Sequence, residues 1–115
     1  PLVAFANTVR ISSLVKPNTI NEQIVCADGF TMSVQAGERH YCEPRIDEAL
    51  AYVTVEVGYP SEPEALLSSY CEDPSRPTST VYGYVPVDKV SLVCAKHGGI
   101  VAGKLPAGIP YLGAL

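Results

Sequence analysis

Two pairs of residues carry side chains that bind metals or act as nucleophiles. His40 and Cys42 lie two apart in FTMSVQAGERHYCEPR (residues 30–45), and Cys94 and His97 lie three apart near the end of the chain. Residues two apart on an extended segment point to one side, and residues three apart on a helix share a face. One alternative is therefore a tetrahedral zinc site built from both pairs. The plainer alternative places Cys94 in the core and His97 at a helix C-terminus, where the helix dipole favours it. Because the close Cys-x2-4-Cys pair of common zinc motifs is missing, we expect no metal and no cofactor.

A cysteine nucleophile is another alternative for this stretch. It needs a thiolate beside a histidine that a third group orients. Side chains at alternate positions of one strand rarely meet in hydrogen-bond geometry, and no helix N-terminus is predicted at Cys42 to activate it. The sequence also contains no phosphate-binding loop, dinucleotide fingerprint or hydrolase elbow. We predict that the chain is not an enzyme, and a small metal-binding or cysteine-dependent domain stays as an alternative.

Composition limits the class of protein. The 115 residues predict a single domain over residues 1–115. The formal net charge of −4 argues against a nucleic-acid partner, since duplex binding needs a basic surface. No run reaches the roughly 18 apolar residues that cross a bilayer, so no membrane span is expected. The four cysteines (Cys26, Cys42, Cys71 and Cys94) are widely and irregularly spaced. This spacing favours reduced thiols in a cytoplasmic protein over the paired cysteines of a secreted one.

Alternating apolar and polar residues predict strands. Asp28-Gly29 separates two such runs and predicts a tight hairpin turn, because both residue types tolerate positive φ. In the second arm the buried face is predicted to carry Phe30, Met32 and Val34.

Two later runs predict further strands. AYVTVEVGYP (residues 51–60) places its valines on one face: Val53, Val55 and Val57. TVYGYVPV (residues 80–87) contains Gly83, which marks a bulge or a close backbone approach.

Two segments predict helices. SEPEALLSSYCED (residues 61–73) predicts a short helix with Ser61 as its N-cap. PVDKVSLVCAKHGG predicts the best helix, about residues 86–97, which Gly98 ends in the left-handed conformation. The order of elements predicts an α+β domain. We expect a mainly antiparallel sheet of about four strands with the C-terminal helix packed on one face.

Both ends of the chain are apolar. Residues 1–8 carry no charge, and residues 101–115 carry one charge among glycines, prolines and large apolar side chains. Such segments are usually docked in extended form, on their own domain or on another copy. They therefore predict self-association into a homo-oligomer. The predicted partner contacts are three tail residues and three of the seven tyrosines, placed on polar strand faces: Ile109, Tyr111, Leu112, Tyr52, Tyr82 and Tyr84.

Four stretches carry a resemblance: VCADGFTMSVQAGERHYCEPR, YVTVEVGYP, VYGYVPVDKV and KHGGI. Over about residues 26–100 the chain resembles small uncharacterised proteins encoded by bacteriophages and prophages. The resemblance implies a bacterial host cytoplasm, reduced cysteines and an accessory role during infection or lysogeny. It implies no catalytic residue.

Two functions fit these predictions. The first is a non-enzymatic phage-type accessory protein that binds, and through binding inhibits, a host protein. The second is a structural subunit of a virion or filament, assembled through its apolar termini and located in the virion or an extracellular assembly. In the first case the acidic residues and the tyrosines are the contacts to a basic partner; otherwise the acidic residues form a solvated rim.

Overall fold

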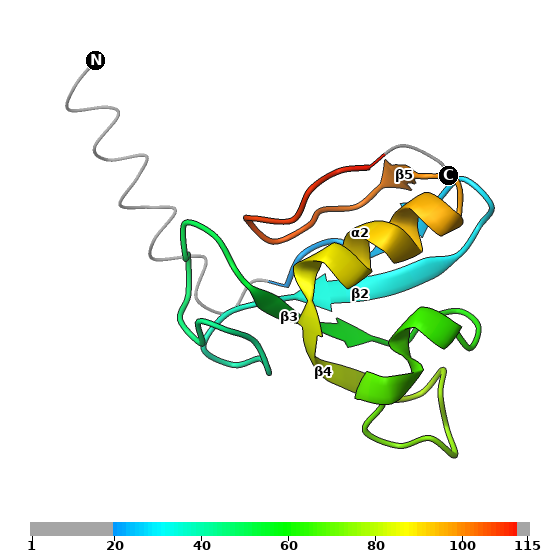
Figure 1. Ribbon diagram of the computed structural model, residues 1–115, viewed down its shortest axis with the longest axis horizontal. Coiled ribbons are helices and arrows are strands. Elements are labelled where there is room, and N and C mark those ends of the chain that lie inside the picture. Colours follow the sequence, from blue (N-terminus) through cyan, green and yellow to red (C-terminus); the bar gives the residue numbers. More distant parts are fainter. Residues whose placement is uncertain (1–19, 113–115) are drawn as a thin grey trace.

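The computed structural model describes residues 20–112 and shows an α+β domain (Figure 1). In chain order its elements are β1 (Ile24–Cys26), β2 (Thr31–Gln35), β3 (Thr54–Gly58), the 3-10 helix η2 (Ala65–Tyr70), β4 (Val81–Pro86), α2 (Val87–Lys96) and β5 (Ile100–Ala102). The five strands form one antiparallel sheet in the order β4-β3-β2-β1-β5. The predicted class is confirmed. The sheet has one strand more than the expected four because β5 forms inside the apolar tail.

Helix α2 lies across one face of the sheet, and the core fills the space between them (Figure 1). Burying one large aliphatic side chain contributes about 1.5–3 kcal/mol, so the core between α2 and the sheet provides most of the stability. Its fully buried members include Ile24, Met32, Val34, Val55, Val57, Leu67, Val85, Val90 and Val93.

Strands β1 and β2 form the predicted hairpin. Gly29 has a φ of 94°, and Oδ1 of Asp28 accepts a hydrogen bond from the Phe30 amide at 2.9 Å. Phe30, Met32 and Val34 are buried, as the alternation predicts. The turn leaves Oδ2 of Asp28 available for a contact outside the hairpin.

Of the two alternatives predicted at Gly83, a bulge or a close backbone approach, the structure shows a bulge. The register between β3 and β4 shifts between Val55 and Val57, so that Gly83 and Tyr84 together oppose Glu56. Tyr84 has a φ of 54°, in the left-handed region that a bulky residue seldom adopts. The extra residue reverses the alternation of faces along β4.

One valine of the third predicted strand was assigned to the wrong face. β3 begins at Thr54, and Val53 before it is 66% exposed, whereas Val55 and Val57 are buried. The backbone of Val53 donates to the carbonyl of Glu43 and accepts from the amide of Val87. These contacts hold Val53 outside the alternation of the strand.

The helix predicted at residues 61–73 is also shorter and differently capped. It is the 3-10 helix η2, and its N-cap is Glu64, whose carboxylate accepts from the Leu66 amide at 2.9 Å. Ser61 instead exchanges two hydrogen bonds with Thr31: its amide donates to the Thr31 carbonyl, and its Oγ accepts from the Thr31 amide. Ser61 therefore fastens the chain to β2.

Helix α2 matches the prediction for about residues 86–97. Pro86 is its N-cap, His97 is its C-cap, and Gly98 follows with a φ of 93°. Val90 and Cys94 face the core, as their helical spacing predicts.

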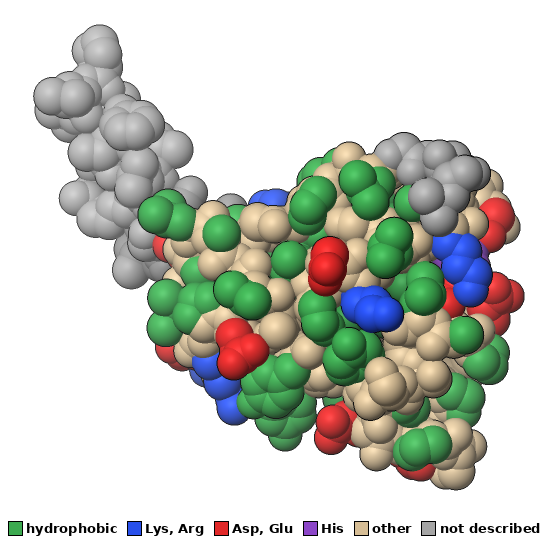
Figure 2. Space-filling view, viewed as in Figure 1, with side chains coloured by type: hydrophobic (Ala, Val, Ile, Leu, Met, Phe, Trp, Pro, Cys, Tyr) green, Lys and Arg blue, Asp and Glu red, His purple; other side chains and the backbone are tan. Residues whose placement is uncertain are grey.

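The described part of the C-terminal tail docks on its own domain. β5 pairs with β1, the Tyr52 amide donates to the Ala107 carbonyl, and Oγ of Ser91 donates to the Pro110 carbonyl. Leu105 and Ile109 are each 6% exposed. On the face that carries α2, hydrophobic side chains are separated by polar and charged ones (Figure 2). The segment 1–8, predicted to be extended and apolar, lies outside the described residues.

Candidate functional site

His97, at the end of α2, is buried between two carboxylates. Its Nδ1 lies 2.7 Å from Oδ2 of Asp28, and its Nε2 lies 2.6 Å from Oε1 of Glu64. The other Glu64 oxygen accepts from Nζ of Lys96 at 2.8 Å. The ring of Phe30 stacks on the imidazole with centroids 4.0 Å apart. These five residues form the His97 clamp, which joins α2 to the hairpin turn and to η2.

Hydrogen bonds favour the charged forms of His97, Glu64 and Asp28. Burial opposes the imidazolium most strongly, but the Glu64 and Asp28 carboxylates outweigh it and raise the pKa of His97. Burial likewise opposes the Glu64 carboxylate, yet Lys96, the Leu66 amide and His97 lower the pKa of Glu64. The Phe30 amide, followed by His97, lowers the pKa of Asp28. These shifts favour an imidazolium between two carboxylates.

The clamp occupies both ring nitrogens of His97. A general base or a metal ligand needs one unoccupied ring nitrogen, and a carboxylate engages each nitrogen of His97. Its role is to hold three elements together.

The four candidate metal ligands do not converge. His97 belongs to the clamp, while Nδ1 of His40 lies 3.0 Å from Oε1 of Glu56. Sγ of Cys42 contacts the amide and the carbonyl of Gly37 at 3.2 Å each, and Cys94 is buried in the core. Among residues 20–112, no three His, Cys, Asp or Glu side chains are grouped to hold a metal ion.

All four cysteines are free thiols in the structure. Burial raises the pKa of Cys42, and burial together with neighbouring Cys26 raises the pKa of Cys94 to about 12. A nucleophilic thiol needs the opposite shift. These two thiols behave as small core side chains.

The predicted partner contacts divide into two groups. Tyr52 and Tyr82 are buried at 6% and 1% exposure, with hydroxyls that donate to the carbonyls of Ile46 and Pro77, so their assignment to an exposed face was wrong. Ile109 is buried as well. The exposed members are Tyr84, Tyr111 and Leu112.

Tyr84 belongs to an exposed aromatic surface that the sequence analysis only partly identified. The ring centroid of Tyr84 lies 5.9 Å from that of Tyr41, and the Arg45 guanidinium lies 5.2 Å from the Tyr41 centroid. The Tyr84 amide donates to the Tyr41 carbonyl, which fixes the segment before Arg45 along the outer edge of β4. We call Tyr41, Arg45 and Tyr84 the aromatic surface. The sequence predicts Tyr84 as a partner contact on a polar strand face, but it gives no signal for Tyr41 or Arg45.

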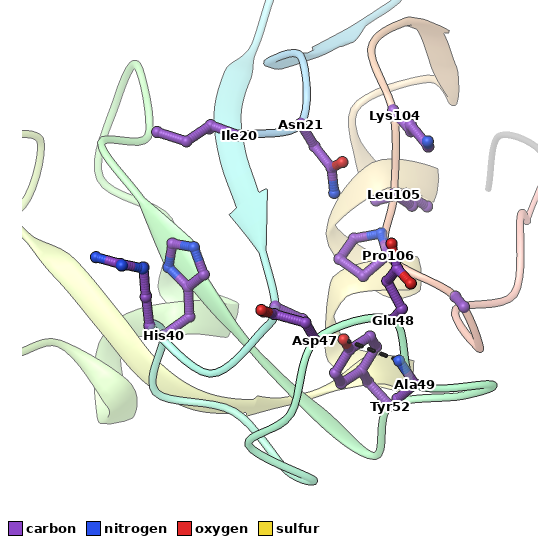
Figure 3. A pocket seen from close by; sticks show the side chains of 13 residues that line it. Ile20, Asn21, His40, Asp47, Glu48, Ala49, Tyr52, Lys104, Leu105 and Pro106 are labelled. Atoms are coloured by element: carbon purple, nitrogen blue, oxygen red, sulfur yellow. Dashed lines mark hydrogen bonds between the residues drawn. The ribbon is translucent and has the colours of Figure 1, made fainter. Parts of the chain in front are cut away.

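A cavity of about 650 Å³ lies on another side of the loop between β2 and β3, the loop that carries Tyr41 and Arg45 (Figure 3). This volume is within the range of small-molecule sites. Three segments distant in the sequence form it: the start of the described chain, the loop after β2, and the tail after β5. We call it the His40 pocket, and its lining residues are Ile20, Asn21, Ala36, Arg39, His40, Asp47, Glu48, Ala49, Tyr52, Lys104, Leu105, Pro106 and Ala107.

Hydrogen bonds fix the walls of the pocket. Gln35 holds Asn21 in place, because its side-chain oxygen accepts from the Asn21 amide and its nitrogen donates to the Asn21 carbonyl. The Tyr52 hydroxyl accepts from the Ala49 amide at 3.3 Å (Figure 3). Oδ1 of Asp47 accepts from the Glu38 amide at 3.0 Å.

One carboxylate joins the pocket to the aromatic surface. Oε1 of Glu56 contacts the His40 imidazole, and Oε2 accepts from the Tyr41 amide at 3.2 Å. This pairing leaves Nε2 of His40 without a partner among residues 20–112. A carboxylate-oriented imidazole resembles half of a general-base arrangement. The described lining, however, contains no serine, threonine or cysteine to serve as a nucleophile.

No protein-family model, curated protein or solved structure matches this chain. In the part of the chain that the structure describes, every helix is too short or too polar to cross a membrane.

Proposed function

We propose that this chain is a non-enzymatic binding domain that recognises a protein partner through its aromatic surface. In the bacteriophage context that the sequence resemblance implies, the partner is a host protein of the bacterial cytoplasm, and binding inhibits it. Oligomerisation through the tail is a separate proposal that now depends on Tyr111 and Leu112, since Ile109 is buried in its own domain.

The grouping of Tyr84 with Tyr41 and Arg45 carries this proposal. Tyr84 is 46% exposed, its ring centroid lies 5.9 Å from that of Tyr41, and the Arg45 guanidinium lies over the Tyr41 ring. Its left-handed φ of 54° is shared by Tyr59, so the backbone conformation alone does not mark the surface. Tyrosine and arginine are the side chains most enriched in the energetic centres of protein interfaces. Tyr84, Tyr41 and Arg45 provide such a group on one surface.

The contacts of His97 and the burial of two thiols support a binding role over catalysis. Carboxylates engage both nitrogens of His97. The thiols of Cys42 and Cys94 have raised pKa values, which disfavour the reactive thiolate.

Substitution of the aromatic surface tests the proposal, and Tyr59 offers a matched control. Tyr59 is also exposed, at 56%, and also has a positive φ, 52°. Immobilised full-length wild type, Tyr41→Ala, Tyr84→Ala and Tyr59→Ala are each exposed to bacterial lysate, and captured proteins are quantified by mass spectrometry. We expect one or more proteins that wild type and Tyr59→Ala capture in equal amounts. Tyr41→Ala and Tyr84→Ala should capture at least about tenfold less of the same proteins.

Urea unfolding of each variant separates loss of binding from loss of fold. If Tyr41→Ala and Tyr84→Ala remain folded and capture the same proteins as wild type in equal amounts, the aromatic surface is not the binding site.

A further inference from the structure

We propose that the His40 pocket binds a small zwitterion, namely an amino acid with an aliphatic side chain. This ligand site is separate from the aromatic surface and does not depend on the protein partner.

The charges that line the pocket match a ligand with one charge of each sign. Arg39 and Lys104 are positive, and Asp47 and Glu48 are negative. Within residues 20–112 no salt bridge joins any two of these four, although they line the same cavity. Opposite charges that share a cavity without neutralising each other attract a molecule that can bridge them.

The positions of the side chains suggest how the ligand lies. His40 forms one wall, Glu48 lies near Pro106 on the opposite wall, and Asp47 lies between them (Figure 3). An ammonium group fits beside Asp47 and Glu48. A carboxylate fits beside His40 and its neighbour Arg39, whose guanidinium matches carboxylate geometry.

The rest of the lining suits an aliphatic body. It is supplied by Ile20, Ala36, Ala49, Leu105 and Pro106. Most ligand sites combine such apolar walls with a few polar groups that fix orientation.

Several polar groups are held in place before any ligand arrives. Glu56 orients His40, and the Glu38 amide orients Asp47. Glu48 has a left-handed φ of 55°, a conformation that a non-glycine residue rarely adopts. Groups ordered in advance reduce the entropy that binding must overcome.

Three probes with the same aliphatic body test the site on the full-length chain. L-Leucine carries both charges, 4-methylpentanoate carries only the carboxylate, and 3-methylbutylamine carries only the ammonium. Binding is measured by amide chemical-shift changes in two-dimensional NMR. We expect leucine to bind with a dissociation constant of about 1 mM and to shift the amides of His40, Ala49 and Tyr52. Each single-charge probe should bind about tenfold more weakly, because it lacks one charge-assisted contact.

Two variants assign the charges. Glu48→Gln should weaken binding of leucine and of the amine but not of 4-methylpentanoate. Arg39→Gln should weaken binding of leucine and of 4-methylpentanoate but not of the amine. Glu62→Gln, an exposed carboxylate outside the lining, should leave all three unchanged.

Three results would overturn the proposal: no shifts with leucine up to about 10 mM, shifts confined to residues outside the pocket, or binding of a single-charge probe as tight as that of leucine. None of them bears on the aromatic surface, which the variants of Tyr41 and Tyr84 test separately.

Discussion

The two histidines of this chain make similar contacts in different surroundings. Both engage a glutamate, His97 through Nε2 to Glu64 at 2.6 Å and His40 through Nδ1 to Glu56 at 3.0 Å. The His97 side chain is 7% exposed and engages a second carboxylate, whereas that of His40 is 22% exposed and lines a cavity. The same pair of residue types thus stabilises the fold in one place and, within residues 20–112, leaves a ring nitrogen without a partner in the other.

Their positions in the fold explain the contrast. His97 caps α2, and its partners lie on the hairpin turn and at the start of η2, so the clamp connects rigid elements. His40 lies in the loop between β2 and β3. Loops positioned by a rigid scaffold are where binding groups usually occur. The clamp is therefore part of the scaffold, and the pocket is what the scaffold presents.

Removing Glu64 should have the largest effect. Glu64→Ala takes away the partners of His97, Lys96 and the Leu66 amide in one step and leaves a buried imidazole nitrogen unpaired. We expect the free energy of unfolding to fall by about 3 kcal/mol, as for other broken buried charge pairs. Urea denaturation monitored by circular dichroism measures it.

Glu62→Ala is the control for this change. Glu62 is exposed and lies two residues before Glu64, so its loss should change stability by no more than about 0.5 kcal/mol. Equal effects of the two substitutions would mean that the clamp contributes nothing to stability.

Substituting each histidine in turn compares the two regions directly. His97→Gln loses the charged contacts to Asp28 and Glu64 and the stacking on Phe30, and should cost about 2 kcal/mol. His40→Gln loses one contact in a more open setting and should cost about 1 kcal/mol or less. Matched urea titrations give both values, and a larger cost at His40 would reverse the roles assigned here.

The features that the sequence predicts correctly are those set by residues adjacent in the chain. The hairpin at Asp28-Gly29 and the end of α2 at Gly98 follow from local conformational preference, and the structure confirms both. The N-cap of η2 was misassigned to Ser61 for the opposite reason. Ser61 is held by Thr31, 30 residues away, and Glu64, which caps η2 in its place, also contacts Lys96 and His97, 32 and 33 residues away.

The misplaced tyrosines show how one residue alters a pattern. Tyr82 and Tyr84 share a face in an uninterrupted strand, but the bulge at Gly83 and Tyr84 shifts the alternation, so Tyr82 is buried and Tyr84 is exposed. A bulge is one of the two alternatives predicted at Gly83, and the extra residue of a bulge moves the residues on its two sides to opposite faces. The His40 pocket had no local signal, since its walls come from segments brought together only by β5 and the loop after β2.

The dependence of stability on pH gives a smaller but more specific test. The pKa values of Asp28 and Glu64 are lowered in the fold, so their contribution is complete above their ordinary values, 3.8 and 4.5, and is lost as pH falls through the folded values. The pKa of His97 is raised, so its contribution is complete below its ordinary value of 6.5 and is lost as pH rises through the folded value. The clamp should therefore stabilise most between pH 4.5 and 6.5.

The difference between wild type and His97→Gln isolates this contribution. Above pH 6.5 the stability advantage of wild type should decline, at no more than about 1.4 kcal/mol per pH unit for one proton. Below pH 4.5 it should decline again, because protonated carboxylates no longer compensate the buried imidazolium. Urea midpoints at half-unit pH steps measure both limbs. An advantage that stays constant from pH 4.5 to pH 9 would mean that the pKa of His97 is the same in the folded and unfolded states, and the carboxylates would then not favour its charged form.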